Sequence, residues 1–166
     1  MRVIYSGLLY LLVPLIPLYL KKRGKKNPQY LENWHERFGW NLVNPTTKPI
    51  IWLHSVSVGE TRAMSKLVEL FHENLPEYQI LITTMTPTGR ETAKNLYPYA
   101  HIHYVPYDLS FSVRRFYKTF KPKLGIILET EIWPNLIYFA AHNAIPLYLV
   151  NARLSNRSYI GYRRFK

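Results

Sequence analysis

The sequence contains no cysteine among its 166 residues, and only ten acidic residues stand against 22 lysines and arginines. The absence of cysteine excludes disulfides and cysteine-based metal sites, and it permits a reducing compartment. Six histidines are present, but no two have the spacing of a typical metal-binding pair, so we expect no metal site. About half of the residues are apolar, which excludes a disordered chain and suffices for the core of one ordinary domain.

The net charge of +12 is concentrated at the two ends of the chain. Residues 1–37 contain seven lysines or arginines and two acids, whereas residues 151–166 contain five lysines or arginines and no acid. Two basic ends favour contact with an anionic partner, for which nucleic acid, anionic lipid and a phosphorylated substrate all qualify. A basic surface that only keeps the protein in solution is the simpler alternative.

An uncharged, mostly apolar run covers residues 3–20 and is followed at once by the basic segment 21–26. Its length reaches the lower limit for a helix that spans a bilayer. A cleavable signal peptide has its charges before the apolar run, so we interpret residues 1–26 as an uncleaved membrane anchor with a cytoplasmic basic flank. Pro14 and Pro17 would kink this helix, which leaves open a segment that lies in the membrane interface. A buried helix of a soluble core is the third interpretation.

From residue 50 onward, short apolar runs alternate with helical stretches. This alternation predicts parallel βαβ units with helices on both faces, that is, an α/β, Rossmann-like doubly wound domain of about five strands. Ligands of such sheets bind beyond the carboxyl ends of the strands. We expect the strands at residues 50–54, 79–84, 101–105, 124–128 and 146–150, and the helices at 60–75, 90–97, 110–120 and 132–143, with a further helical stretch from about 155.

The first strand is followed by the loop 55–59 and then by Glu60. We expect Gly59 to allow a tight turn, after which Glu60 lies in the first turn of the next helix. The positive helix end stabilises a carboxylate there, and an ionised carboxylate at the mouth of a cleft can act as a general base. An acid that only caps the helix is the more common reason for this placement.

The second and fourth strands also end in polar residues. Thr84, Thr86 and Thr88 form a hydroxyl-rich loop before a helix start, which suits phosphate or sugar hydroxyls, although an ordinary threonine-capped loop has the same composition. Glu129 directly follows the buried fourth strand, where an unpaired charge is costly, so it must face a cleft or a cation. Trp133 could pack on a sugar or acyl chain, or in the core. We expect residues 87–89 to break the second apolar run before the helix at 90–97, and Ser110 to cap the third helix.

Two arginines follow the fifth strand. Arg153 and Arg157 are four residues apart, so a helix would place them on one side. Paired guanidinium groups recognise phosphate well, and we therefore predict that this pair helps to hold a phosphate. A solvated, basic helix start is the alternative.

Six motifs, in their order and spacing, resemble those of the bacterial Kdo (3-deoxy-D-manno-octulosonic acid) transferases. The resemblance runs the length of the chain, and the N-terminal apolar segment with its basic flank fits it as well. The motifs are WHERFG (34–39), HSVSVGE (54–60), TTMTPTG (83–89), PYDL (106–109), ETEIWPN (129–135) and NARLSNRS (151–158).

The resemblance implies a two-domain GT-B fold, with residues 27–166 as its N-terminal, acceptor-binding half and the C-terminal donor domain absent. It implies metal-independent, inverting transfer of Kdo from CMP-Kdo to the lipid A precursor, without a cofactor. The reaction belongs to lipopolysaccharide synthesis at the cytoplasmic face of the inner membrane. Glu60 would be the general base and Glu129 a transition-state stabiliser. The implied acceptor contacts are Ser57, Gly59, Thr84, Thr86, Thr88, Arg153 and Arg157.

By the same resemblance, the chain alone should bind the acceptor at best and should not transfer sugar. An alternative of another class is a membrane-tethered module that holds anionic lipids of the inner membrane through its basic ends, without chemistry. A nucleic-acid-binding domain is a third hypothesis. The chain lacks a recognisable RNA- or DNA-binding motif and its N-terminus is apolar, so we expect no nucleic acid partner.

Overall fold

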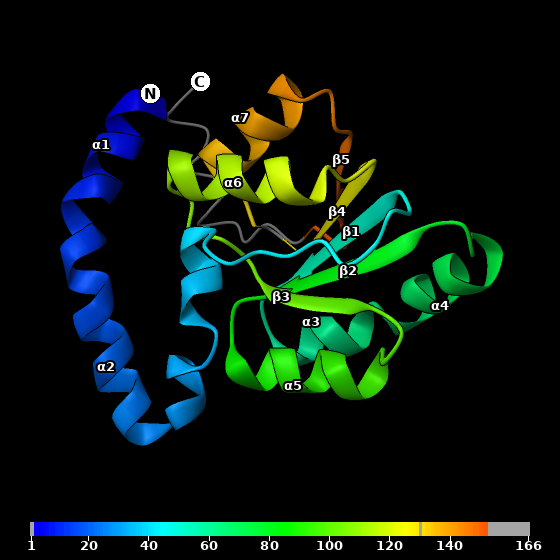
Figure 1. Cartoon of the computed structure of the whole chain (residues 1–166), viewed down its shortest axis with the longest axis horizontal. Coiled ribbons are helices and arrows are strands. Elements are labelled where there is room, and N and C mark those ends of the chain that lie inside the picture. The colour runs from blue at the N-terminus through cyan, green and yellow to red at the C-terminus, as the bar shows by residue number, and fades with distance from the viewer. Residues whose placement is uncertain (1, 130, 153–166) are drawn as a thin grey trace.

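The computed structural model describes residues 2–129 and 131–152, and it places five parallel strands in one sheet (Figure 1). The strand order is β3-β2-β1-β4-β5, and helices cover both faces, so the predicted α/β fold class is confirmed. The strands are β1 (Ile50–Ser55), β2 (Gln79–Thr84), β3 (His101–Tyr104), β4 (Leu124–Leu128) and β5 (Leu147–Val150). The helices are α1 (Arg2–Leu12), η1 (Val13–Leu15), α2 (Ile16–Lys26), η2 (Pro28–Leu31), η3 (Trp34–Phe38), α3 (Val58–Ala63), α4 (Ser65–Asn74), α5 (Pro87–Leu96), α6 (Ser110–Phe120) and α7 (Pro134–His142).

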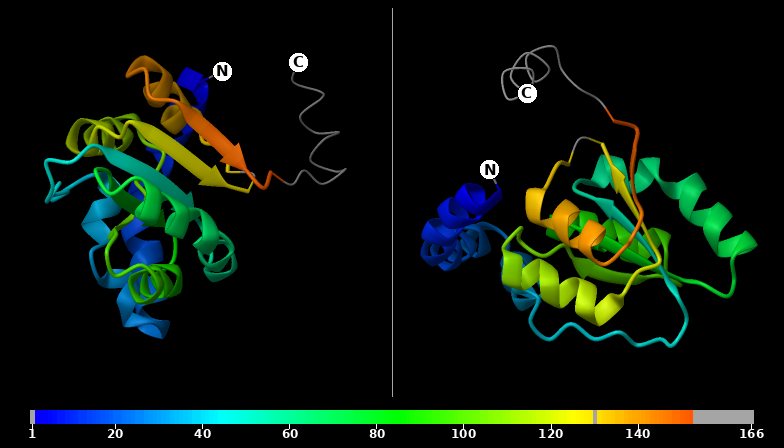
Figure 2. Two further views of the ribbon diagram at one scale, coloured as in Figure 1. Left: turned by 90° about the vertical axis from the view of Figure 1, so that its right-hand side faces the viewer. Right: turned by 90° about the horizontal axis from the view of Figure 1, so that it is seen from above.

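Alternate residues of the central strand β1 pack against opposite layers of helices. Trp52 is fully buried and contacts Phe116 of α6, with ring centroids 5.0 Å apart, in the core that α6 and α7 cover. Leu53 faces the other core, to which α4 and α5 contribute Val68 and Ala93. Figure 2 shows the sheet between these two layers. Because both faces exclude water, β1 is apolar throughout most of its length.

Several details of the helices differ from the prediction. The expected helix 60–75 is divided at Met64, whose side chain is buried in the core between α3 and α4. The second strand ends before Pro87 as expected, but Pro87 already begins α5, where its missing N–H costs no hydrogen bond. Ser110 is the first residue of α6 and does not cap it, because its hydroxyl instead donates to Asn135 Oδ1 at 3.4 Å.

The N-terminal segment forms a long helical rod beside the domain (Figures 1 and 2). The 3-10 turn η1 joins α1 to α2, so Pro14 tightens one turn and does not end the helix. The rod, Arg2–Lys26, is long and apolar enough to cross a membrane, and only 11% of its apolar window is buried. The interpretation as a buried core helix is therefore wrong, and the predicted apolar anchor helix is confirmed as a structural element.

The short helices η2 and η3 return from the rod to the body of the domain. Gly39 ends η3 with a left-handed φ of 68°, and a Cβ there would lie 2.7 Å from the carbonyl oxygen of Ser112 in α6. Only glycine satisfies both conditions without strain. This close approach fixes the chain against α6 just before the long connection to β1.

Candidate functional site

The carboxyl end of β1 holds Glu60 in a set of short hydrogen bonds. Glu60 Oε2 accepts from the backbone N–H of Val56 at 2.6 Å, and Oε1 accepts from the Ser57 hydroxyl at 2.8 Å. Ser57 is the N-cap of α3, and its Oγ accepts from the backbone N–H of Glu60 at 3.3 Å. The pair therefore forms a variant of the capping box, in which the glutamate reaches the residue before the N-cap.

These contacts show that Glu60 caps the helix, as the alternative interpretation expected. They also hold the carboxylate at the carboxyl edge of the sheet. Only 9% of Glu60 is exposed. Among the described residues, no lysine or arginine lies within ion-pair distance of it. Each carboxylate oxygen has one donor among the described residues, and such an oxygen can accept a second hydrogen bond. The geometry thus leaves Glu60 able to receive a hydrogen bond from a bound hydroxyl group.

Gly59 has a different role from the predicted one. It lies in the first turn of α3 without a positive φ, so the turn after β1 does not require glycine and that expectation was wrong. A Cβ at this position would meet only Ser57 Oγ, at 3.9 Å. Gly59 is exposed, and its missing side chain leaves the start of α3 open to solvent.

The threonine-rich loop after β2 lies directly beside this site. Thr86 caps α5 by accepting from the backbone N–H of Gly89 at 3.1 Å, and its hydroxyl donates to the Val56 carbonyl at 3.4 Å. Thr88 is exposed and donates to Thr86 Oγ1 at 3.4 Å. Thr84 is fully buried, so its side chain does not reach the surface as the prediction requires of a direct contact. The loop is therefore both a helix cap and a hydroxyl surface next to Glu60.

Glu129 follows β4 in a strained conformation. Its φ of 59° is left-handed, which costs a non-glycine residue about 1–2 kcal/mol. The backbone N–H of Glu129 donates to the Val150 carbonyl at 2.9 Å, which ties this turn to β5. Strained residues of this kind cluster at functional sites. Because β4 pairs with β1 in parallel, Glu129 and Glu60 follow strands that end at the same edge of the sheet.

The other residues predicted near this edge fall into two groups. Trp133 packs against the core beneath α7, and its indole N–H donates to Glu131 Oε2 at 2.6 Å. It therefore takes the core-packing alternative. Arg153 and Arg157 lie outside the described residues.

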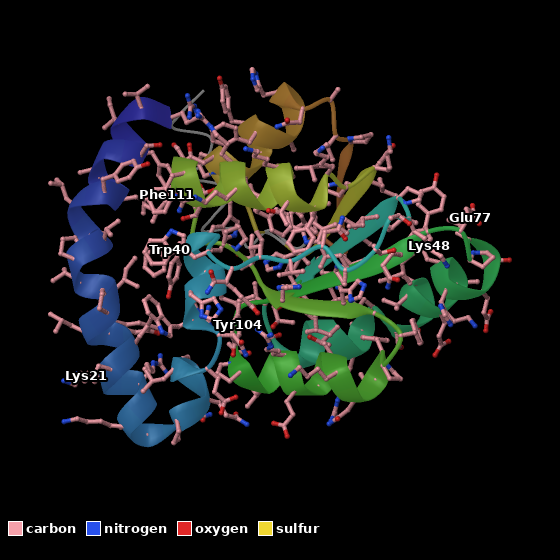
Figure 3. The ribbon with its side chains drawn as sticks, in the orientation of Figure 1. Lys21, Trp40, Lys48, Glu77, Tyr104 and Phe111 are labelled. Carbon is pink, nitrogen blue, oxygen red and sulfur yellow. The ribbon has the colours of Figure 1, made fainter. Side chains whose placement is uncertain are left out.

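A buried acid that the sequence analysis did not single out connects η3 to the sheet. Glu36 Oε1 accepts from Arg90 Nη2 of α5 at 3.0 Å, and Oε2 accepts from the backbone N–H of Tyr104 at 2.8 Å. His103 Nδ1 lies 3.5 Å from Oε1. Burial alone would raise the pKa of Glu36, but the hydrogen bonds from His103, Arg90 and Tyr104 lower it to about 2. Figure 3 shows Tyr104 where η3 approaches the end of β3.

The next residue, Arg37, reaches the loop after β2. Only 2% of it is exposed, and its Nη1 donates to the carbonyl oxygen of Met85 at 3.0 Å. Its guanidinium carbon lies 3.9 Å from the centre of the Tyr104 ring, and its own carbonyl accepts from the Tyr107 N–H at 2.7 Å. Thus η3 joins the carboxyl ends of β2 and β3. The motif WHERFG pointed to this segment, but only the fold shows what its charged residues contact.

A second polar cluster connects α1 to the start of α7. Asp108 accepts from the backbone N–H groups of Asn135 at 2.9 Å and Leu136 at 2.8 Å, and so caps the first turn of α7. Asn135 Oδ1 accepts from Arg2 Nη1 and from Ser6 Oγ, both at 3.1 Å. The rod therefore docks on the helix that follows the loop after β4, close to the candidate site.

The histidine of the Glu60 motif is not available to a ligand at this edge. His54 begins the motif that ends at Glu60, but it is fully buried, and burial lowers its pKa to about 4 against the opposing hydrogen bond to the Thr83 carbonyl. It is neutral near pH 7. The part of the chain that the structure describes contains no group of three or more metal-ligating side chains.

Comparison with known proteins identifies relatives of this chain. The family described as 3-Deoxy-D-manno-octulosonic-acid transferase (kdotransferase) matches residues 32–166. The match begins just before WHERFG and covers every strand and the helices from η3 onward.

Three curated relatives illustrate the range of similarity. A 3-deoxy-D-manno-octulosonic acid transferase of Haemophilus influenzae is 39% identical over 99% of this chain and 39% of its own length. A probable mitochondrial 3-deoxy-D-manno-octulosonic acid transferase of Arabidopsis thaliana is 36% identical over 94% of this chain and 35% of its own length. The Bordetella pertussis transferase is 34% identical over 95% of this chain and 38% of its own length. The chain thus spans less than two fifths of the length of these relatives.

Proposed function

The chain belongs to the 3-deoxy-D-manno-octulosonic-acid transferase family, and from this premise we propose that it is the N-terminal, acceptor-binding half of a GT-B glycosyltransferase. The whole enzyme would transfer Kdo from CMP-Kdo to the lipid A precursor during lipopolysaccharide synthesis. In this proposal, residues 27–166 bind the acceptor, and a second domain of the whole enzyme binds the donor. The chain alone is then inactive.

One observation carries the proposal: two carboxylates follow neighbouring parallel strands at the edge where such sheets bind ligands. Glu60 is held by Val56 and Ser57 without a cation, and Glu129 has a strained backbone. Both residues lie in motifs that resemble those of the family.

The proposed chemistry follows from this placement. Glu60 takes the proton of the acceptor hydroxyl while the hydroxyl oxygen attacks the anomeric carbon of Kdo. The bond between that carbon and CMP breaks, and CMP departs with the bond electrons. Glu129 stabilises the charge that develops at the transition state. Ser57 holds the Glu60 carboxylate in place, while the open start of α3 admits the acceptor. The further predicted acceptor contacts are Gly59, Thr86 and Thr88 at the surface, Thr84 through its support of that loop, and Arg153 and Arg157.

We also propose that the rod lies in the membrane interface at the cytoplasmic face of the inner membrane. Its inner side makes polar contacts with the domain, through Arg2 and Ser6, which a spanning helix would have to break. Its basic end at α2 suits anionic lipid headgroups. Its outer side is an apolar stripe at helical spacing, between 56% and 77% exposed: Val3, Ile4, Leu8, Leu11, Leu15 and Leu18.

Flotation with vesicles that contain anionic lipid tests this placement. Leu11→Glu with Leu15→Glu should abolish flotation, because charge is then buried among acyl chains. The matched control is Leu70→Glu with Leu96→Glu, which adds the same charge at exposed leucines of α4 and α5 and should leave flotation intact. An alkaline carbonate wash should release the bound chain. Retention after that wash would mean that the rod spans the bilayer.

Restoring a donor domain tests the function. A chimera in which this chain replaces the matching N-terminal part of the Haemophilus influenzae relative should transfer labelled Kdo from CMP-Kdo to lipid A precursor. The chain alone should bind the acceptor without transfer. A folded chimera that binds CMP-Kdo but transfers no sugar would refute the proposal, provided that the unaltered relative is active in the same assay.

One observation favours a second candidate function. Both oxygens of Glu60 already accept hydrogen bonds that cap α3, so a purely structural Glu60 explains the same contacts. In that case the domain is a membrane-tethered module that holds anionic lipid without chemistry. An inactive chimera whose vesicle binding is intact would favour this candidate.

A further inference from the structure

A basic cavity lies at the amino end of the sheet, remote from the candidate site. Its volume is about 730 Å³, within the range of small-molecule sites. It opens where α6 and α7 end, and the connection from α6 to β4 completes it. Its rim carries four cations, and no acidic residue lines it. The basic side chains are Arg114, Lys118, Lys121, Lys123 and, in addition, His142.

The floor of this cavity is apolar. Tyr117 and Phe139 belong to the core beneath α6 and α7, and each is at most 5% exposed. Ile145 completes the floor at 9% exposure. A cationic rim over an aromatic floor can hold a molecule that carries phosphate at one end and an apolar or planar group at the other.

Helix ends account for only part of this positive charge. Each helix C-terminus carries roughly half a negative charge, so the ends of α6 and α7 call for about one compensating cation between them. Four lysine and arginine side chains surround the cavity, and none of them forms an ion pair with a described acid. The exposed cations of the rim therefore exceed what the two helix ends compensate, and this excess can attract an anionic ligand.

Lys121 at the rim also has an unusual backbone conformation. Its φ of 43° is left-handed at the position after α6, where glycine is the usual residue. Ala144, which lines the same cavity after α7, is also left-handed, with φ 53°. The left-handed turn at Lys121 places its cation at the rim of the cavity at some cost in backbone strain.

We propose that this cavity binds a soluble phosphorylated ligand of the nucleoside di- or triphosphate class, with phosphates at the rim and the base on the floor. This goes beyond the proposed transferase function and does not depend on it. The position argues against a lipid headgroup. The amino end of α6 lies beside the rod, where Phe111 contacts Tyr10 at 6.2 Å, whereas the cavity lies at the other end of α6, about 16 Å away. Figure 3 shows Lys48 and Glu77, which precede β1 and β2, at this end and Lys21 of the rod on the far side.

Calorimetric titration of the full chain in mild detergent tests the site, with ADP and pyrophosphate as probes. ADP should bind more tightly than pyrophosphate, because only ADP can use the floor. Lys121→Gly removes one cation and relieves the left-handed strain, so it should weaken binding of both probes about fivefold while the melting temperature stays the same or rises. Adding Lys118→Gln should weaken binding further.

Two matched control variants test whether binding depends on this cavity or only on the total positive charge of the chain. Ala144→Gly changes a left-handed residue of the same cavity without loss of charge, and Lys22→Gln removes one charge from the rod. Both should keep wild-type affinity. No saturable binding of either probe, or an equal loss in Lys22→Gln and Lys121→Gly, would overturn the proposal. Loss of binding to phosphatidylglycerol vesicles in Lys121→Gly, with no binding of ADP, would assign the cavity to lipid headgroups and also overturn it.

Discussion

Glu36 and Glu60 are both buried glutamates from short motifs, yet their surroundings are opposite in kind. Glu36 accepts hydrogen bonds from the Arg90 guanidinium and from the backbone of Tyr104, so a buried cation neutralises it. Within residues 2–129 and 131–152, Glu60 accepts only from neutral donors, the backbone of Val56 and the hydroxyl of Ser57. An acid committed to a cation stabilises the fold and is a poor base, whereas an acid held by neutral donors can be both positioned and reactive. The partners of a carboxylate, and not its burial, therefore separate the two roles.

Replacing the acid in the Glu60 region should have the largest effect on turnover. In the chimera described above, Glu60→Gln should lower kcat by about 10²–10⁴, because the amide cannot take the proton. The amide oxygen can still accept from Val56 while the amide nitrogen faces Ser57, so the free energy of unfolding should fall by only about 1 kcal/mol. Turnover and urea unfolding of the same variant check both numbers. A folded variant with wild-type kcat would show that Glu60 only caps α3.

The same substitution at Glu36 should lower the stability of the fold instead of the turnover. Glu36→Gln leaves Arg90 buried beside a neutral group, so the free energy of unfolding should fall by about 3–5 kcal/mol. The control is Glu91→Gln, an exposed acid of α5, which should change it by less than about 0.5 kcal/mol. Urea unfolding measures both. If Glu36→Gln and Glu91→Gln changed the free energy of unfolding equally, the ion pair of Glu36 with Arg90 would not stabilise the fold.

Acid should distinguish the two glutamates as well. The pKa of Glu36 is lowered from 4.5 to about 2, so its stabilising contribution is complete above about pH 5 and is lost as the pH falls towards 2. Between these limits, the free energy of unfolding of the unaltered chain should fall by on the order of 3 kcal/mol more than that of Glu36→Gln. Denaturant unfolding at several acidic pH values gives the difference. Parallel curves for the two proteins would contradict the lowered pKa.

Removing a neutral donor should have a small effect. Ser57→Ala deletes the N-cap of α3 and one of the two donors to Glu60, which should cost about 1 kcal/mol of stability. Ser57→Thr keeps the hydroxyl and should restore most of this loss. Thermal unfolding of the two variants provides the measurement. Equal destabilisation by alanine and threonine would mean that the side-chain oxygen does not cap the helix.

The smallest expected effect is a gain in stability at the third carboxylate. Glu129→Gly relieves the left-handed backbone and should raise the free energy of unfolding by about 0.5–1 kcal/mol, whereas Glu129→Ala should not. Both variants should lower turnover of the chimera if the carboxylate takes part in the reaction. Differential scanning calorimetry and Kdo transfer together separate strain from chemistry. A glycine variant with full turnover would leave only a structural role for Glu129.

Much of the fold was predictable because its signals are local. Apolar runs such as residues 124–128 and the polar breaks between them predicted the sheet and its helices, and an apolar run with a basic flank predicted the rod. The misplaced boundaries at Met64 and Pro87, and the missing cap at Ser110, all depend on one or two hydrogen bonds at helix ends. Periodicity does not carry that information.

The site was predictable only in part. The sequence placed Glu60 and Glu129 at the carboxyl edge of the sheet, because both follow predicted strands, but their catalytic roles stay predictions. Glu36 was not found, since its partners Arg90 and Tyr104 lie 54 and 68 residues away, and no local pattern connects them. Thr84 was predicted as a direct contact, but packing buries it.

The sequence by itself determined the class of fold, the apolar rod and the family, because each follows from periodicity, composition or motif order within a short span of chain. Only the tertiary structure decided which carboxylate is paired with a cation, where the rod docks, and which cations surround one cavity. Those outcomes depend on contacts between distant segments, such as Arg2 with Asn135, 133 residues apart. Such contacts form only when burial of the two apolar faces of the sheet brings the segments together, and a local pattern does not record which partners then meet.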